Sequence, residues 1–209
     1  MGFLDVLVIL LITIGPTKAA AVYLAMTAGT EPAFKRQVAI RTVTVATIVC
    51  AIFALLGKAI LGMFHISLPA LMIAGGLILF VFALHLVLGE DHEADDKGGA
   101  PRTPSLDIAA YPLAVPLMAT PQGIVAIATI GGSNPGFGNS LMLLAGVLIV
   151  MGINIVVLLF ADRIFAKLSP SVLKVVMRVL GLLLCGLAVQ LVILGLTQLG
   201  VLPPQPGAH

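Results

Sequence analysis

The chain has no tryptophan and few charged residues: only 10% of its 209 residues are Asp, Glu, Lys or Arg. A soluble domain carries about 25% charged residues, so this composition excludes an ordinary soluble protein. Without tryptophan, anchoring at a membrane interface would fall to tyrosine and phenylalanine. The formal net charge of +2 is too small to indicate a nucleic-acid partner. An integral membrane protein is the class that remains.

Cysteine and deeply placed acidic residues are also scarce. The two cysteines, Cys50 and Cys185, lie inside apolar runs, which argues against a structural disulfide. All nine acidic residues lie near the ends of apolar segments or in polar stretches, so a buried carboxylate relay is missing. An intramembrane Asp pair, His-Glu-x-x-His and Gly-x-Ser-x-Gly are missing too. We therefore expect no enzyme activity, no metal site and no cofactor.

Long apolar segments dominate what is present. Hydrophobic residues make up 60% of the chain, and the mean hydropathy is +1.18. A helix needs about 20 apolar residues to cross a bilayer, so an all-α protein with six membrane-spanning helices is predicted. The predicted spans are residues 3–27, 38–61, 67–89, 110–131, 140–161 and 172–199.

One long polar stretch, "EDHEADDKGGAPRTPS", separates the third span from the fourth. Its Gly, Pro, Asp and Glu content is typical of a flexible linker. The predicted organisation is therefore a three-helix unit over 1–89, a cytoplasmic linker over 90–109, and a second three-helix unit over 110–209 that ends in a short external tail.

Basic residues mark one side of the membrane. Lys58 is the single basic residue on one side, and Lys18 lies inside a span and belongs to neither side. Lys and Arg accumulate on the cytoplasmic side of membrane proteins. Both termini are therefore predicted to face the outside of the bacterial inner membrane. The cytoplasmic set is Lys35, Arg36, Arg41, Lys97, Arg102, Arg163, Lys167, Lys174 and Arg178.

The chain also contains an internal repeat. A shift of 105 residues, with no gap, places Pro16 on Pro121, Lys58 on Arg163 and Gly76 on Gly181. Each unit has three spans, and this odd number means that the second unit enters the membrane in the opposite direction. The sequence therefore predicts a 3+3 inverted-topology repeat, an arrangement common in secondary transporters.

The repeat gives meaning to two interruptions, "TIGPTK" and "MATPQG", near the centres of spans one and four. Proline removes a backbone donor and frees a carbonyl of the preceding turn. By symmetry the two broken helices should meet at the midplane, where helix N-termini suit an anion and free carbonyls suit a cation. The alternative is a pair of packing kinks.

The predicted substrate-binding site follows from these breaks. Its backbone donors and its oxygen donors both suit a zwitterion such as an amino acid. Thr17, Lys18, Gln122 and Gly123 open the half-helices after Pro16 and Pro121 and should present N–H groups. Thr13, Gly15, Ala119 and Thr120 should present carbonyl or hydroxyl oxygens.

Two polar side chains within the spans extend this site. Lys18 is nine residues from Thr27, which corresponds to about 13 Å along a helix. Intramembrane lysines usually mark function. The ammonium could lie among the freed carbonyls, pair with a substrate carboxylate, or line a cytoplasmic vestibule. Asn154 in span five either lines the path or serves packing, since a buried amide needs partners.

The chain resembles the MarC family of six-span membrane proteins, also called the neutral amino acid transporter family. The resemblance rests on "FHISLPALMIAGGLILFVFAL" (64–84), "YPLAVPLMATPQGI" (111–124) and "EPAFKRQVAIR" (31–41). Family members usually have Asn-Pro-x-Gly in the first break and Gly-Pro-Gly in the second. This chain has Gly15-Pro16-Thr17-Lys18 and Thr120-Pro121-Gln122 instead. The resemblance therefore supports the architecture of the family better than its substrate, because the sequence departs from the family pattern at the expected binding site.

The resemblance implies a secondary transporter that moves small neutral amino acids, such as glycine and alanine, by alternating access between the two broken helices. A proton or a sodium ion would be the coupling cation, and the lipid bilayer the surroundings. The alternatives are an exporter of another small solute, a passive channel, or a membrane scaffold that transports nothing. The sequence does not decide whether the chain forms a homo-oligomer.

Overall fold

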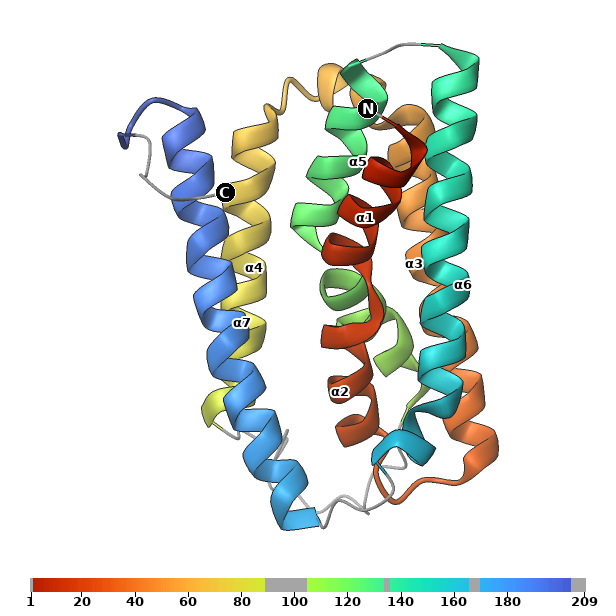
Figure 1. The fold of residues 1–209 in the computed structure, drawn as a ribbon. Helices are drawn as coiled ribbons and strands as arrows, with labels where there is room; N and C mark the ends of the chain where they lie inside the picture. Colours follow the sequence, from red (N-terminus) through yellow and green to blue (C-terminus); the bar gives the residue numbers. More distant parts are fainter. Residues whose placement is uncertain (1, 89–104, 134–135, 166–169, 204–209) are drawn as a thin grey trace.

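The computed structural model of the chain describes residues 2–88, 105–133, 136–165 and 170–203, and the secondary structure of these residues is helical throughout. Figure 1 shows α4 and α7 side by side at one flank and α3 and α6 at the other. The broken segments run between these two pairs. The elements are α1 (Phe3–Ile14), α2 (Pro16–Met26), α3 (Pro32–Met63), α4 (Leu68–Leu88), η1 (Leu106–Ala109), η2 (Ala110–Met118), α5 (Pro121–Ser133), α6 (Phe137–Phe165) and α7 (Pro170–Gln198).

Five stretches of the described chain are long and apolar enough to cross a bilayer: Phe3–Met26, Pro32–Met63, Leu68–Leu88, Gly138–Ala161 and Arg178–Gln198. A sixth is present if Leu106–Met118 and Pro121–Gly132, which are bent by 59° relative to each other, form one span. The predicted all-helical class with about six apolar helices is confirmed at this level.

Helix α3 begins earlier than its apolar run because proline and polar residues can occupy a first helical turn. Pro32 opens α3 at one of its first two positions, where the missing N–H costs nothing. The prediction started this span at residue 38, after Lys35 and Arg36. Charged residues extend a membrane helix into the interface while the apolar run alone crosses the bilayer.

The predicted fourth span, 110–131, is not one continuous helix. Tyr111 and Val115 inside η2 have extended backbone, with ψ of 126° at both residues. Each residue precedes a proline, whose ring disfavours the helical region for the residue before it. Of the predicted linker over 90–109, residues 89–104 lie outside the described part. Ser105 then caps η1 by accepting a hydrogen bond from the backbone N–H of Asp107 at 3.2 Å.

The paired helices α4 and α7 approach closely through glycines. A Cβ on Gly195 would lie 2.9 Å from the carbonyl oxygen of Pro69, so only glycine allows this approach. Large apolar side chains such as Leu55 on α3 and Leu182 on α7 are exposed on the outer surface. Lipid is the natural solvent for such a surface, because soluble monomers rarely expose it.

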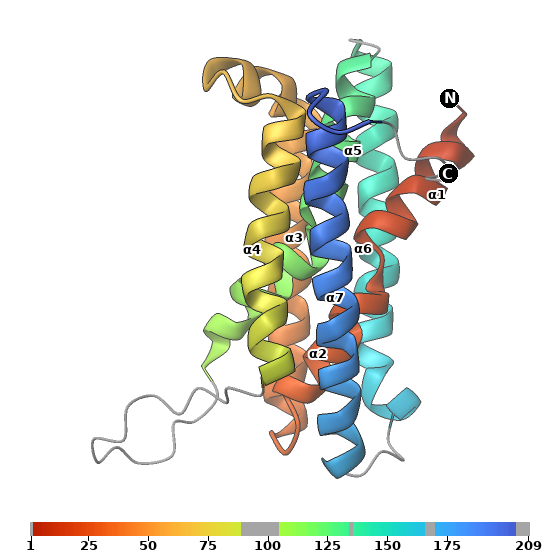
Figure 2. The same cartoon turned by 90° about the vertical axis from the view of Figure 1, so that its left-hand side faces the viewer.

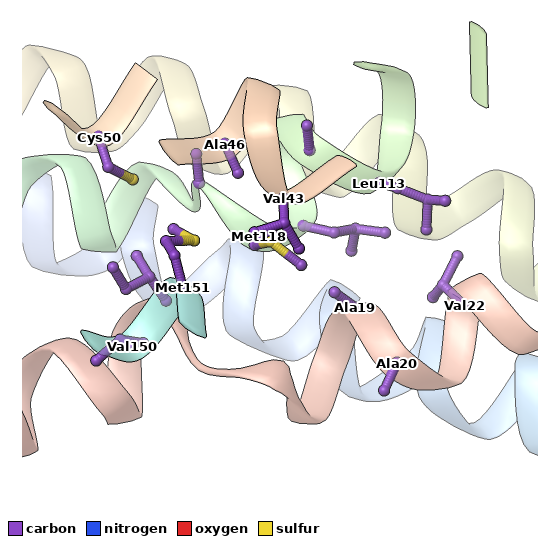
Figure 3. Close-up of a cluster of buried hydrophobic side chains, with 14 of the residues drawn as sticks. Ala19, Ala20, Val22, Val43, Ala46, Cys50, Leu113, Met118, Val150 and Met151 are labelled. Atoms are coloured by element: carbon purple, nitrogen blue, oxygen red, sulfur yellow. The ribbon is translucent and has the colours of Figure 1, made fainter. Parts of the chain in front are cut away.

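The core surrounds the breaks. Figure 3 shows Met118 of η2 close to Val43 of α3, with Ala19 of α2 and Met151 of α6 on nearby helices. All four side chains are buried. The broken segments are therefore enclosed by intact helices, which is where irregular backbone is tolerated at membrane depth.

Candidate functional site

The first break separates α1 from α2 at a single residue, Gly15. Pro16 disfavours helical backbone at the preceding residue, and Gly15 is extended, with φ −74° and ψ 171°. A Cβ on Gly15 would overlap the carbonyl oxygen of Leu11. The backbone approach thus requires glycine, and glycine leaves α2 without a capping side chain.

The second break separates η2 from α5 at Ala119 and Thr120. Ala119 has φ −79° and ψ 75°, and its N–H donates to the carbonyl of Ala114 at 2.7 Å. Thr120 caps α5: its hydroxyl oxygen accepts from the N–H of Gly123 at 2.9 Å, and its carbonyl accepts from the N–H of Ile124 at 2.9 Å. The N-terminus of α5 is thereby largely satisfied.

The two breaks touch each other in the centre of the molecule. The hydroxyl of Thr120 donates to the carbonyl of Thr13 at 2.9 Å. The amide nitrogen of Asn154 on α6 donates to the carbonyl of Ile14 at 2.8 Å. A Cβ on Gly123 would overlap the side chain of Ile14. The carbonyls freed by the first break are therefore held by donors from the second half of the chain.

Water is largely excluded from this cluster. The exposed fractions are 6% for Thr13, 3% for Thr120 and 0% for both Ile14 and Asn154. Hydrogen bonds between buried groups are costly to leave unmade. The hydrogen bonds of this cluster therefore hold α1, α5 and α6 together, and the same residues line the candidate site.

The predicted oxygen donors are mostly engaged. The hydroxyl of Thr13 donates to the carbonyl of Ile9 at 2.8 Å, as threonines within helices often do. The hydroxyl of Thr120 both donates and accepts. The predicted residues flank the breaks. Within the protein, hydrogen bonds already engage the hydroxyls of Thr13 and Thr120 and the N–H groups of Ala119 and Gly123.

The predicted residues flanking the prolines lie at the two helix starts. Pro121 is buried against α4, where a Cβ on Gly75 would overlap its ring. Pro16 and Gln122 are half-buried. Thr17 belongs to the first turn of α2, and its side chain lies outside the described part of the structure.

Two polar groups at the first break remain open. Lys18 is half-buried in the first turn of α2, and its ammonium forms no hydrogen bond or ion pair with the described residues. The oxygen Oδ1 of Asn154 is buried and has no hydrogen-bond partner among them. These two side chains, unlike those of Thr13 and Thr120, keep hydrogen-bonding capacity that the described residues do not use.

Sequence reasoning missed Ile14 and Gly75. Ile14 contributes its carbonyl to Asn154 and its side chain to the contact with Gly123. Gly75 admits Pro121 to the surface of α4. The Gly75-Gly76 pair within an apolar run was a usable signal, because adjacent glycines in a membrane helix indicate close approach of a neighbour. Ile14 carried no signal.

Buried helix breaks inside a bundle of apolar helices define a multi-pass integral membrane protein. The particular family follows from comparison: the model of the MarC family of integral membrane proteins matches residues 2–199, so the chain belongs to this family. The family is not known as one of enzymes. No solved structure gives a significant match to the chain.

Curated relatives match the sequence of this chain along most of their length. UPF0056 membrane protein MJ1677 from Methanocaldococcus jannaschii is 30% identical over 184 residues, which are 88% of this chain and 90% of the relative. UPF0056 membrane protein YvbG from Bacillus subtilis is 25% identical over 87% of both chains. UPF0056 membrane protein PH0214 from Pyrococcus horikoshii is 31% identical over 77% of this chain and 76% of the relative. These names give no substrate.

Proposed function

We propose that the protein is a secondary transporter of small neutral amino acids that works by alternating access between its two broken helices. The observation that carries the proposal is the direct meeting of the two breaks, through Thr120 and Thr13, inside a water-poor core. Helix breaks at such depth need a reason, because unbroken helices satisfy their backbone without help. A transporter supplies that reason, since it must offer polar groups to a solute within the membrane.

The packing of α4 against α7 supports the 3+3 inverted repeat. A Cβ on Gly76 would lie 2.9 Å from Cγ2 of Val192, and a Cβ on Gly181 would lie 2.9 Å from Cγ2 of Val87. The 105-residue shift exchanges these two contacts. Reciprocal contacts of this kind are what a two-fold axis between two halves produces. Spans one and four then become equivalent, with their breaks near the midplane.

The distribution of charge supports the proposed orientation. In Figure 2 the starts of α3 and α7 and the end of α4 lie together, opposite the start of α4. Arg36 near the start of α3 and Arg178 in the first half of α7 are exposed, whereas Lys58 lies near the end of α3. With basic residues inside, both termini face the outside of a bacterial inner membrane.

A passive channel is an alternative class of function, and the packing around the breaks argues against it. Ile14 fills the space beside Gly123, and Pro121 fills the space beside Gly75. A permanently open pore through the breaks would need these contacts to be absent. A scaffold that transports nothing is favoured by the hydrogen bonds that tie the breaks together, so transport itself has to be measured.

Counterflow in proteoliposomes tests the proposal. Purified protein is reconstituted with unlabelled L-alanine inside, and uptake of labelled glycine, alanine or serine is followed with and without a proton or sodium gradient. Transient accumulation above equilibrium is expected, because exchange through alternating access is faster than leakage. Simple equilibration would indicate a channel, and no uptake of any of the three amino acids would overturn the proposal.

A further inference from the structure

We propose that the two breaks are functionally unequal and that the first break alone holds the substrate, with its carboxylate at the start of α2 and its ammonium at Oδ1 of Asn154. The inference rests on the proposed function and deepens it, because it names the groups that recognise each end of the amino acid. It draws on groups whose hydrogen-bonding capacity the protein leaves unused.

The carboxylate end follows from the start of α2. Gly15 offers no capping side chain, and the close approach of the Leu11 carbonyl forbids one. The first turn of α2 therefore has no N-cap side chain to accept from its N–H groups, and these groups and the helix dipole favour an anion there. Lys18 adds an ammonium in the same turn that has no ion pair among the described residues. The first turn of α2 therefore carries both backbone donors and an ammonium, and no cap side chain among the described residues accepts from it.

The ammonium end follows from Asn154. Its amide nitrogen is fixed by the carbonyl of Ile14, the residue just before Gly15. This bond places the amide oxygen close to the break, where it is fully buried and has no hydrogen-bond partner among the residues that the structure describes. An unsatisfied buried acceptor is costly, and a donor from a bound molecule would satisfy it. An α-amino acid carries a carboxylate and such a donor on adjacent atoms.

The second break offers neither half of this site. The 105-residue shift places Thr120 at the position of Gly15, Gly123 at the position of Lys18, and Val49 at the position of Asn154. Thr120 caps its own helix, Gly123 carries no side chain, and valine offers no acceptor. Although the two breaks occupy equivalent positions in the repeat, the second break therefore supports the first and does not bind the substrate.

Three ligands separate the two ends: L-alanine has both groups, propionate lacks the ammonium, and L-alaninol lacks the carboxylate. Their dissociation constants are measured by calorimetry with the purified full-length protein. The wild type is expected to bind alanine more tightly than either analogue. Lys18→Gln should weaken alanine and propionate by about tenfold to a hundredfold and leave alaninol nearly unchanged, because a charged hydrogen bond to the carboxylate is lost. Lys58→Gln is the charge-matched control.

Asn154→Leu should weaken alanine and alaninol but leave propionate nearly unchanged. A purely structural role for Asn154 would lower the melting temperature and weaken all three ligands in parallel, and that result would overturn the assignment of the ammonium. Equal losses of alanine and alaninol in Lys18→Gln would overturn the assignment of the carboxylate. If alanine is exchanged by counterflow yet these patterns fail, the orientation is wrong and the transporter stands. If wild type binds no alanine, both proposals fall.

Discussion

Thr120 illustrates how a single side chain is shared between local and long-range structure. Its hydroxyl caps the first turn of α5 through Gly123 and reaches across to the carbonyl of Thr13. A threonine before a proline is a recognisable N-cap signal in the sequence. The bond to a carbonyl more than a hundred residues away is not, because it depends on which helix face meets which.

We therefore predict that Thr120→Ala destabilises the protein by about 1–3 kcal/mol, since it removes a cap and leaves a buried carbonyl unsatisfied. Thermal unfolding in detergent, followed by circular dichroism, measures the change. Thr120→Ser keeps the hydroxyl and should remain close to the wild type. If alanine and serine unfolded at the same temperature, the hydrogen bonds through Thr120 would contribute nothing.

At the scale of elements, the two breaks have different anatomy. The first is one extended residue between two regular helices, whereas the second follows η2, which is irregular at Tyr111 and Val115. The prolines after these residues made that irregularity predictable, but the prediction placed a single break in the span 110–131, at Thr120-Pro121. The positions of both breaks were predictable from Pro16 and Pro121, because each proline falls inside an apolar run and cannot continue the helix that precedes it.

The hydrogen-bond partners of the polar groups at the breaks were not predictable from the sequence. Thr13 and Thr120 were expected to offer oxygens to a ligand. In the structure the Thr13 hydroxyl donates to Ile9 within its own helix, and the Thr120 hydroxyl donates to the carbonyl of Thr13 on α1. Which partner satisfies a polar group depends on tertiary packing, and a single sequence gives periodicity but no neighbours. Asn154 was identified because an amide within an apolar helix is conspicuous, whereas its partner Ile14 is one apolar residue among many.

The pair α4 and α7 permits a test within one helix. A Cβ on Gly181 would lie 2.9 Å from Cβ of Leu86 and 3.0 Å from the backbone nitrogen of Val87, whereas a Cβ on Gly186 meets nothing within 4 Å. Gly181→Ala should therefore destabilise by about 1–3 kcal/mol through overpacking. Gly186→Ala should be neutral or stabilising by up to about 1 kcal/mol, because alanine favours the helix.

Urea or SDS titration of the two glycine variants, compared with the wild type, measures these differences. Similar unfolding midpoints for Gly181→Ala and Gly186→Ala would show that α4 and α7 are not packed as closely as the structure indicates.

At the scale of the whole molecule, the distribution of charge and the topology support the same orientation in the membrane. The turn from α2 to α3 and the turn from α3 to α4 lie at opposite ends of the bundle, as Figure 1 shows. Arg36 and Arg41 accompany the first turn, and both are exposed. The number of apolar helices was predictable because bilayer thickness fixes their length; how the helices group around the breaks was not.

The orientation can be tested with cysteines at exposed turn positions. In a background that lacks Cys50 and Cys185, Ser67→Cys should react with an impermeant maleimide in intact cells, and Ala28→Cys should react only after the membrane is opened. Basic residues near Ala28 are the physical reason. Labelling of Ala28→Cys in intact cells, with Ser67→Cys protected, would reverse the proposed topology.

The hydrogen bonds from Thr120 and Asn154 to the first break also bear on how the protein is made. Ribosomes deliver α1 and α2 to the membrane long before α5 and α6 exist. Until then the carbonyls of Thr13 and Ile14 lack the donors that hold them in the finished protein. Hydrocarbon offers no substitute for such donors, and an intramembrane lysine such as Lys18 adds to the cost. The first span is therefore expected to reach its native conformation late in synthesis. The nascent chain can satisfy the carbonyl of Ile14 only after Asn154 has entered the bilayer.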